Sequence, residues 1–517
     1  MATNNQHLEV LRHTVLGEPS TEAWDALCEC LESIPKGTLA VALDYVGAHL
    51  DARWPDTLRH IRWTDNEEVE AWLTEPPPYH TLMRSLDVQR VDPYSGAVEA
   101  LIRDPSLGHL THLSLTDLGP DTIRALAGAL HLGNLTHLTL HMGWFDLDAL
   151  TALGGSPILS RLRHLAVTDS WHGEQLGQVL AGSPHVGQLE HLNLGTNGMG
   201  DEGALALAAS PHLTRLTHLD LTRNGIGPAG ACAILHAPHL GPLTFLDLCD
   251  QHHHNRTHSI FAPRIRARQT PSPSTRHAPQ PRHALHLNLG GCRLGSPGAK
   301  KLAETKRLRR FQRLDLDFNN LTAPALGHLL TSPHIGQLTH LSLRDNHLSA
   351  EAARLLAAAP SLANLTYLDL ANNTISTPGA LALANSPHLA RLTYLNLQGN
   401  AIATAGIQAL ANSPHLTQLT HLNLNRNALG PDGMQALANA PHLSLLDQLN
   451  LAHNAIGDEG AQVLANTATL DHLTHLDLSW NDIGPKGGRV LARAAHLASL
   501  TYLEIRGNRL SRKESRI

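Results

Sequence analysis

The chain has 517 residues and a net charge of −6, with 3% aromatic residues and an apolar fraction of 42% that is mostly Leu and Ala. Several independent compact cores would use more large aromatic residues, so this composition indicates one small unit repeated many times. The sequence shows no run of 18 apolar residues and no secretory signal, and its five cysteines include no C-x-x-C pair, so we expect a cytoplasmic protein. Its net charge does not indicate a membrane or nucleic-acid partner.

Residues 1–82 carry helical patterns without a repeat. We expect helices over about 6–16, 22–33, 38–52 and 66–74, with Thr21 and Asp65 as N-cap residues. Asp65 and Glu68 have the spacing of a capping box. The segment is interpreted as a helical N-terminal cap domain that covers the open end of a solenoid. An independent recruiting domain is the alternative.

Residues 83–517 repeat a motif of the form L-x-x-L-x-L about every 27 residues, in sixteen copies. The copy that begins at Leu392 has Leu395 and Leu397 two residues apart, so both side chains leave the same face of a short strand. Gly406 and Leu410 follow in a stretch with helical spacing. One unit has too little apolar surface to fold alone, and stacking joins the leucine faces into one core.

This pattern resembles the leucine-rich repeat family in its ribonuclease-inhibitor-like subclass, on the motif Leu392-x-x-Leu395-x-Leu397-x-x-Asn400-x-Ile402. The resemblance implies an α/β leucine-rich repeat solenoid, or horseshoe. Its parallel sheet would line the concave face, its helices the convex face, and the cap would precede residue 83. The resemblance also implies protein binding.

Ten repeats carry an asparagine eight residues after the first leucine. A buried amide must find partners, and an asparagine column can bond the backbone of neighbouring turns. The first four units have Val91, Leu118, Gly143 and Ser170 there, so we expect that end to be less regular. The predicted structural asparagine ladder is Asn197, Asn224, Asn319, Asn346, Asn373, Asn400, Asn427, Asn454, Asn481 and Asn508.

Residues 249–283 interrupt the period with a stretch rich in Arg, His and Pro. Such a composition buries too little surface to become ordered, so we expect a disordered insertion; a local shift of the reading frame in a GC-rich gene is the alternative. The last repeat stops at Ile517 before a complete helix, so either the basic tail covers the last turn or the chain is truncated.

Histidine is abundant, with 37 residues, and much of it is copied with the repeat. One set fills the Leu-Thr-His-Leu position and is expected in a column on the concave face. A regular column offers pairs of imidazoles rather than the three or four converging ligands of a zinc site, so no metal is expected. With an ordinary pKa near 6.5, the column would become charged below about pH 6 and loosen the fold.

The concave face should also carry a polar column between the two inward leucines of each strand, followed by positions that vary. Variation at fixed geometry is typical of a surface that recognises a partner, and Tyr, Trp and Arg are frequent in binding hot spots. The candidate partner-binding residues are Asp315, Arg344, Tyr367, Asp369, Tyr394, Asn396, Asn423, Arg426, Asp477, Trp480, Tyr502 and Arg506.

No enzyme motif is present, and the Asp and His columns repeat at every turn whereas catalysis needs one special site. A basic stretch at residues 300–310 lacks the aromatic residues that stack on nucleic acid. We therefore expect a monomeric bacterial scaffold without cofactors that binds an unknown protein. A GTPase-activating regulator of a small GTPase and a secreted effector that mimics host leucine-rich repeats are the alternatives.

Overall fold

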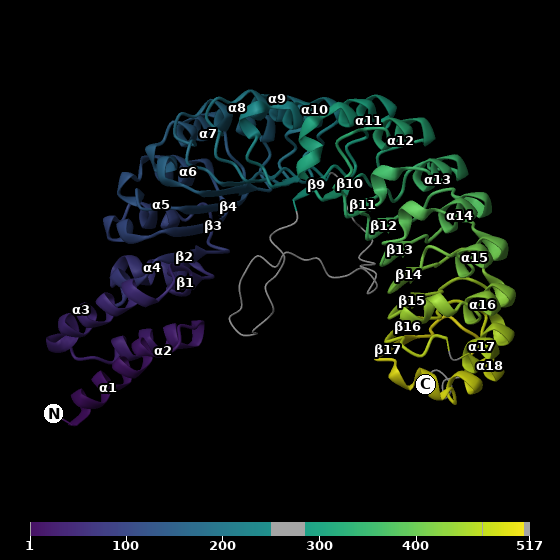
Figure 1. Ribbon diagram of the computed structural model, residues 1–517. Coiled ribbons are helices and arrows are strands. Elements are labelled where there is room, and N and C mark those ends of the chain that lie inside the picture. The colour runs from purple at the N-terminus through teal and green to yellow at the C-terminus, as the bar shows by residue number, and fades with distance from the viewer. Residues whose placement is uncertain (1, 250–284, 468, 511–517) are drawn as a thin grey trace. The chain divides into compact units, whose positions relative to one another are not determined.

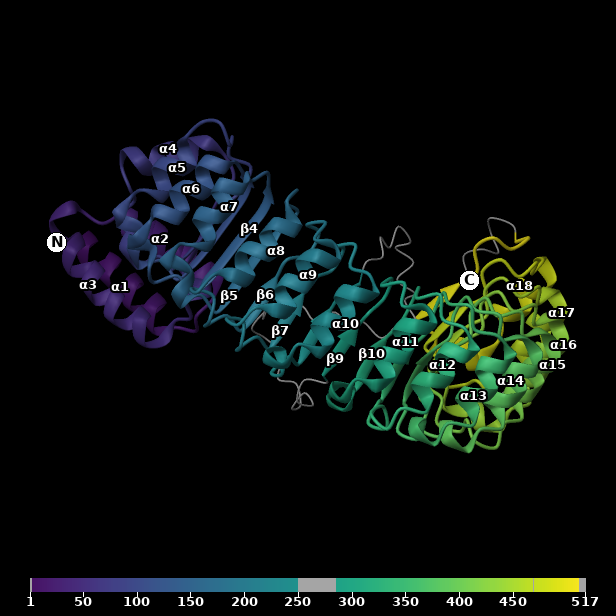
Figure 2. The same cartoon turned by 90° about the horizontal axis from the view of Figure 1, so that it is seen from above.

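The computed structural model describes residues 2–249, 285–467 and 469–510, and they form two compact units. Unit 1 runs to Leu246, and unit 2 comprises the described residues from Asp247 on. In both units parallel strands line one face and helices cover the other (Figures 1 and 2). This plan confirms the predicted α/β repeat solenoid.

Unit 1 begins with three helices and continues with alternating strands and helices. Its helices are α1 (Ala2–Leu16), α2 (Thr21–Glu32), α3 (Lys36–Arg53), α4 (Asn66–Thr74), α5 (Ala97–Ile102), α6 (Pro120–Gly128), α7 (Leu147–Gly154), α8 (Gly173–Gly182), α9 (Gly200–Ala209) and α10 (Pro228–His236). Its strands are β1 (His60–Trp63), β2 (Ser85–Val88), β3 (His112–Leu118), β4 (His137–Gly143), β5 (His164–Thr168), β6 (His191–Asn193), β7 (His218–Asp220) and β8 (Phe245–Asp247).

Unit 2 repeats one strand and one helix throughout. Its strands are β9 (His286–Asn288), β10 (Arg313–Asp315), β11 (His340–Ser342), β12 (Tyr367–Asp369), β13 (Tyr394–Asn396), β14 (His421–Asn423), β15 (Gln448–Asn450), β16 (His475–Asp477) and β17 (Tyr502–Glu504). Its helices are α11 (Gly295–Glu304), α12 (Ala323–Leu330), α13 (Ala350–Ala357), α14 (Ser376–Ala384), α15 (Ala403–Ala411), α16 (Gly430–Ala438), α17 (Gly457–Asn466) and α18 (Pro485–Leu491).

The leucines of the repeat form the core, as their spacing predicts. Leu392, Leu395 and Leu397 are all buried, and Leu395 of β13 pairs in parallel register with Leu422 of β14, 27 residues later. Ile402, buried as well, precedes the helix. Because each repeat offers the same apolar positions at the same spacing, stacking produces one continuous leucine core within the unit.

The first three helices pack against one another around Trp24, Leu27, Val46 and Leu50. The helices lie where the sequence predicts them, but the N-cap of α2 is Ser20 instead of Thr21, because the Ser20 hydroxyl accepts a hydrogen bond from the Ala23 amide. Asp65 caps α4 as expected and accepts from the Glu68 amide.

The strand-and-helix pattern begins before residue 83. Strand β1 pairs in parallel with β2 through four residues, and α4 packs beside α5, so residues 60–74 already form a unit of the solenoid. This unit could not be predicted from the sequence, because Ile61 and Trp63 stand where most other repeats have leucine. The helical segment outside the sheet therefore ends with α3, at Arg53.

The asparagine ladder joins each repeat to the one before it. Asn427, for example, donates from Nδ2 to the carbonyl of Leu397 in the preceding repeat and to that of Leu424 in its own, at 2.8 and 3.1 Å. Its Oδ1 accepts from the amides of Asn400 and Ile402 at 3.1 and 3.2 Å. Nine of the ten ladder side chains are buried, and Asn508 is partly exposed.

The first four repeats, which lack the asparagine, are irregular, as expected, and their strands β2 to β5 are longer than those of unit 2. Strands β3 and β4 have seven residues each, whereas the strands of unit 2 have three. Leu118 and Gly143, which stand at the ladder position, pair directly in the sheet. Backbone pairing between strands thus replaces side-chain bonds at this position.

The predicted insertion at 249–283 lies outside the described residues except for Cys249, and so do the last seven residues of the chain.

Replacing Asn400 by Ala should lower the free energy of unfolding by on the order of 1–3 kcal/mol, because buried backbone groups lose their partners. Asn508→Ala should cost less, since Asn508 is partly exposed and water can substitute for its bonds. Urea unfolding followed by circular dichroism measures both. Equal losses, or no loss for Asn400→Ala, would contradict the structural role of the ladder.

Candidate functional site

A column of five histidines lies on the strand face of unit 1, one from each of β3 to β7. Neighbouring ring centroids lie between 3.9 and 4.1 Å apart, with interplanar angles between 13° and 16°. The rings stack because parallel strands in register place equivalent side chains above one another. The members of this histidine column are His112, His137, His164, His191 and His218.

The threonine that precedes a histidine orients its ring. The hydroxyl of Thr136 donates to the carbonyl of Thr111 at 3.2 Å, and its oxygen lies 2.9 Å from Nδ1 of His137. A hydroxyl has one hydrogen, so Nδ1 of the imidazole must donate to it. In the neutral ring this leaves Nε2 without a proton.

Burial and the neighbouring rings oppose protonation of the histidine column. Burial, followed by the charges of His112 and His164, lowers the pKa of His137 to about 3. Burial also lowers the pKa of His112, His164 and His191. For these four histidines the folded pKa is therefore lower than the ordinary value on which the expected charging below about pH 6 was based.

The strand face of unit 2 carries tyrosines in the equivalent column. The rings of Tyr367 and Tyr394 stack at 4.1 Å with an interplanar angle of 10°, between His340 and His421. Tyr394 is 5% exposed, so its ring belongs to the framework more than to the surface.

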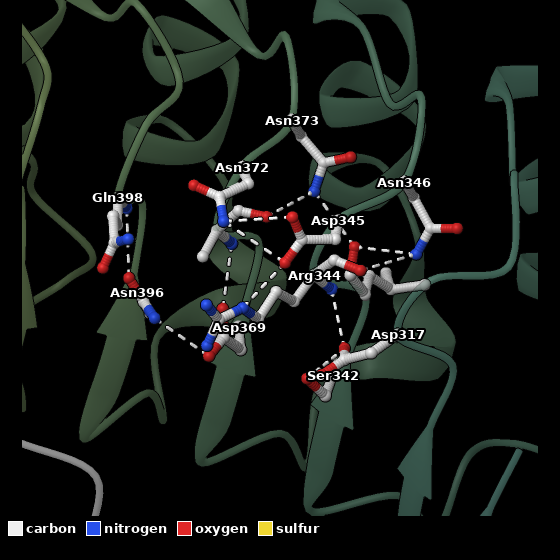
Figure 3. Close-up of polar contacts among 12 residues, drawn as sticks. Asp317, Ser342, Arg344, Asp345, Asn346, Asp369, Asn372, Asn373, Asn396 and Gln398 are labelled. Atoms are coloured by element: carbon white, nitrogen blue, oxygen red, sulfur yellow. Dashed lines mark hydrogen bonds and ion pairs between the residues drawn. The ribbon is translucent and has the colours of Figure 1, made fainter. Parts of the chain in front are cut away.

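Beside the tyrosines, a polar network links four successive repeats of unit 2 (Figure 3). Asn396 donates to Asp369 at 2.9 Å, and Arg344 contacts Asp345 at 2.8 Å. Asp317 accepts from the Ser342 hydroxyl at 2.6 Å and from the Arg344 amide at 2.8 Å. Asn396 thus contacts Asp369, and the charge of Arg344 also acts on Asp369.

The carboxylates of this network lie close to one another on a partly dehydrated face. Burial, followed by the charge of Asp369, raises the pKa of Asp315 to about 6. Burial and the neighbouring Asp315 and Asp369 raise the pKa of Asp317 well above its ordinary value. Burial raises the pKa of Asp369 too. The guanidinium of Arg344 partly offsets this for Asp315 and Asp369.

The polar column expected to face a partner serves to end the strands. Except at Ser342, where the Arg344 amide donates to Asp317, the side-chain oxygens of this column from Asn193 on accept a hydrogen bond from the amide two residues on, as between Asn396 and Gln398 at 3.0 Å. Such a turn lets a short polar side chain satisfy the backbone where the strand stops. The same bond is made by Asp315, Asp369, Asn423, Asp477 and Glu504.

The twelve candidate residues differ in their exposure. Four are buried: Asp369, Tyr394, Asn396 and Asn423. Five are partly buried: Asp315, Arg344, Tyr367, Asp477 and Tyr502. Three are exposed: Arg426, Trp480 and Arg506. The buried residues have structural partners, so only the exposed ones present most of their surface to another molecule.

One position recurs in every regular turn with a backbone conformation that was not predicted from the sequence. The residue just before the ladder asparagine has a positive φ, near 57° at both Arg426 and Trp480 and 55° at His453. A non-glycine residue there is strained by on the order of 1 kcal/mol and persists only where its surroundings fix the backbone. The bonds of the ladder on either side supply that constraint.

Three of these left-handed residues and one neighbour form a row in unit 2, made of Arg426, His453, Trp480 and Arg506. His453 is partly buried and the other three are exposed, and we call this set the exposed row. The Trp480 indole is 55% exposed and stacks on His453 at 5.5 Å with an interplanar angle of 5°. A Cβ on Gly507 would lie 2.4 Å from the indole, so glycine leaves room for the ring there. Backbone bonds of 2.9 to 3.0 Å hold Arg426, His453 and Trp480 against the next repeat.

Within the described ranges, no three His, Cys, Asp or Glu side chains converge as metal ligands. No helix in these ranges is both long and apolar enough to cross a membrane.

The histidine column makes stability depend on pH. Because the folded pKa values are lowered, the unfolded chain binds more protons below about pH 6.5, so the free energy of unfolding falls as the pH decreases. Replacing His137, His164 and His191 by Gln should weaken this dependence between about pH 7 and pH 5. Urea unfolding at both pH values measures it, and an unchanged slope in the triple variant would contradict it.

The carboxylates of unit 2 predict the opposite dependence of stability on pH, with a free energy of unfolding that falls as the pH rises. Asp317 has a raised pKa in the folded state, so its contribution to stability is lost as the pH rises through that value. Asp317→Asn keeps the acceptor oxygen and removes the charge, and it should stabilise by on the order of 1 kcal/mol at about pH 7 and by less near pH 4. The exposed Asp432→Asn is the control in the same unfolding measurement, and equal effects of the two substitutions would contradict this assignment.

Comparison with known proteins agrees with the repeat. The family model described as "Leucine Rich repeat" matches nine segments, at residues 189–208, 212–235, 282–303, 338–357, 361–384, 388–411, 415–438, 442–465 and 470–492. No curated protein sequence matches the chain. Among the matching solved structures is an internalin from Listeria monocytogenes, with 19% identity, a TM-score of 0.39, and coverage of 85% of this chain and 94% of that one. With its strands and helices in register at the family's spacing, the chain is a leucine-rich repeat protein.

Proposed function

We propose that the chain is a non-enzymatic scaffold that binds a partner protein on the strand face of unit 2, through the exposed row Arg426, His453, Trp480 and Arg506. The observation that carries this proposal is the exposure of Trp480 at a position where the backbone is fixed and strained. A Trp side chain at 55% exposure offers a large apolar surface that another molecule can bury.

The chemistry of the row is that of binding hot spots. Trp and Arg are enriched among residues whose truncation costs the most binding energy. The stacking of Trp480 on His453 fixes the indole before a partner arrives, so little side-chain entropy is lost on binding. Arg506 lies 3.9 Å from Glu504, a contact weak enough in water for its guanidinium to pair with a partner carboxylate.

The regular chemistry of the strand face supports a scaffold and not an enzyme. The Asp and His side chains recur at every turn with structural partners, as in the strand-ending turns and the Thr-His pairs. A catalytic site requires one arrangement that differs from the rest. Binding of this kind needs no cofactor.

The test is a quantitative pull-down with the full chain and a variant carrying Arg426→Ala, Trp480→Ala and Arg506→Ala. We expect proteins recovered with the wild type to fall by at least about tenfold with this variant, since each lost hot spot costs on the order of 2 kcal/mol. The matched control changes Leu381, Lys486 and Arg493 to Ala; all three are exposed and lie outside the strands. Recovery of the same proteins with both variants would contradict the proposed face.

A further inference from the structure

A second exposed apolar cluster lies in unit 1, where the chain leaves strands β2, β4 and β5. We name this cluster, made of Tyr94, Met142, Trp144, Leu147 and Trp171, the aromatic edge. Trp171 is 86% exposed, Tyr94 78% and Trp144 50%. All three follow the carboxyl end of a strand in one parallel sheet, so they share one edge of unit 1.

Two members of the aromatic edge lie side by side, and a third stands at the equivalent position of the neighbouring repeat. The rings of Tyr94 and Trp144 are 6.4 Å apart, although their loops leave strands that are separated by β3. Trp171 stands 27 residues after Trp144, at the same position of the neighbouring repeat, and adjacent strands are only about 4.8 Å apart. The equivalent residues of the next two repeats are Gly198 and Gly225, so the indoles are particular to this part of the chain.

The local packing around Gly143 and Phe145 leaves Trp144 and Leu147 exposed. Gly143 replaces the ladder asparagine, and a Cβ there would lie 2.0 Å from the ring of Phe145. The buried Phe145 therefore occupies the space beneath the turn, while Trp144 on one side and Leu147 on the other remain exposed. The cluster arises where the regular repeat is absent, and the general repeat pattern does not explain it.

Carboxylates surround the aromatic edge and indicate the charge of its partner. An open depression beside Tyr94 is lined by Asp65, Glu67, Asp92 and Asp117, with Arg90 as the cation among its lining residues. On the other side Asp148 is exposed, whereas Asp146 is already paired with Arg124. A cation held over an indole or phenol ring is stabilised further by the ring itself.

We propose that the aromatic edge binds a segment of a partner protein that is rich in Lys, Arg and apolar residues. The apolar residues pack on Met142 and Leu147, the cations lie over Trp144, Trp171 and Tyr94, and the surrounding carboxylates favour the approach of positive charge. This surface is separate from the exposed row of unit 2, so either can fail without the other.

The probe is a fluorescein-labelled synthetic peptide rich in Lys, Arg and Leu, titrated with the full-length protein and followed by fluorescence anisotropy. A second peptide has Gln in place of every Lys and Arg. We expect Trp144→Ala with Trp171→Ala to weaken binding of the basic peptide at least about tenfold. Both side chains are at least half exposed, so the double variant should keep its fold, which circular dichroism checks.

Matched variants separate this site from general attraction between opposite charges. Leu445→Ala removes an exposed large apolar side chain in unit 2, and Asp432→Asn with Asp471→Asn removes two exposed charges there; both variants should bind like the wild type. Glu67→Gln with Asp92→Asn should weaken binding several-fold and reduce its dependence on salt.

Four results would overturn the proposal: no measurable binding, equal affinity of the Gln peptide, equal affinity of the Trp144 and Trp171 double variant, or equal losses in the unit 2 controls. Sedimentation of the wild type and the double variant tests a second copy of the chain as the occupant. A dimer that becomes a monomer on loss of the two indoles would also overturn the proposal.

Discussion

The structure depends on a hydrogen bond that crosses from one repeat to the next. The ladder asparagine accepts from two backbone amides of the preceding repeat and donates to carbonyls of both repeats, as Asn454 does toward Asn427, Leu429, Leu424 and Leu451. The leucines supply most of the burial, but apolar contact has no direction. The hydrogen bonds of the asparagine amide are directional, so they fix the residue at which the chain leaves each strand.

This constraint explains where the molecule can vary. Because the backbone on both sides of the left-handed position is fixed, Arg426, His453 and Trp480 all adopt the same φ within a few degrees. In the first four repeats, which lack the ladder asparagine, the strands are longer, and the exposed residues of the aromatic edge occur there. The two proposed surfaces thus have different origins, one within the regular framework and one where that framework is absent.

Much of the fold could be predicted from the sequence because it depends on spacing. The 27-residue period fixes the parallel register, and the apolar positions fix the core. Strand β1 could not be found, since its pairing with β2 uses backbone groups and carries no leucine signature. The position of the histidine column could be predicted from the sequence, but the lowered pKa of His137 could not. That pKa is lowered by burial and by the neighbouring rings about 4 Å away.

The candidate site was harder to predict than the fold. The polar column looked like a recognition surface, yet the spacing of Asp or Asn to an amide two residues on makes it part of each turn. A recurring Asp or Asn at the end of a short strand was the available signal. Exposure separates Trp480 from Tyr394, and exposure depends on the neighbouring strands, which one repeat does not reveal.

Native-state hydrogen exchange tests the central role of the ladder most directly. The amides of Asn400 and Ile402 lie outside any strand or helix but donate to Asn427. They should exchange as slowly as the strand amide of Tyr394 in the wild type and much faster in Asn427→Ala. Exchange of these two amides as fast as that of the exposed Ala401 in the wild type would contradict the claim that side-chain bonds fix the repeat.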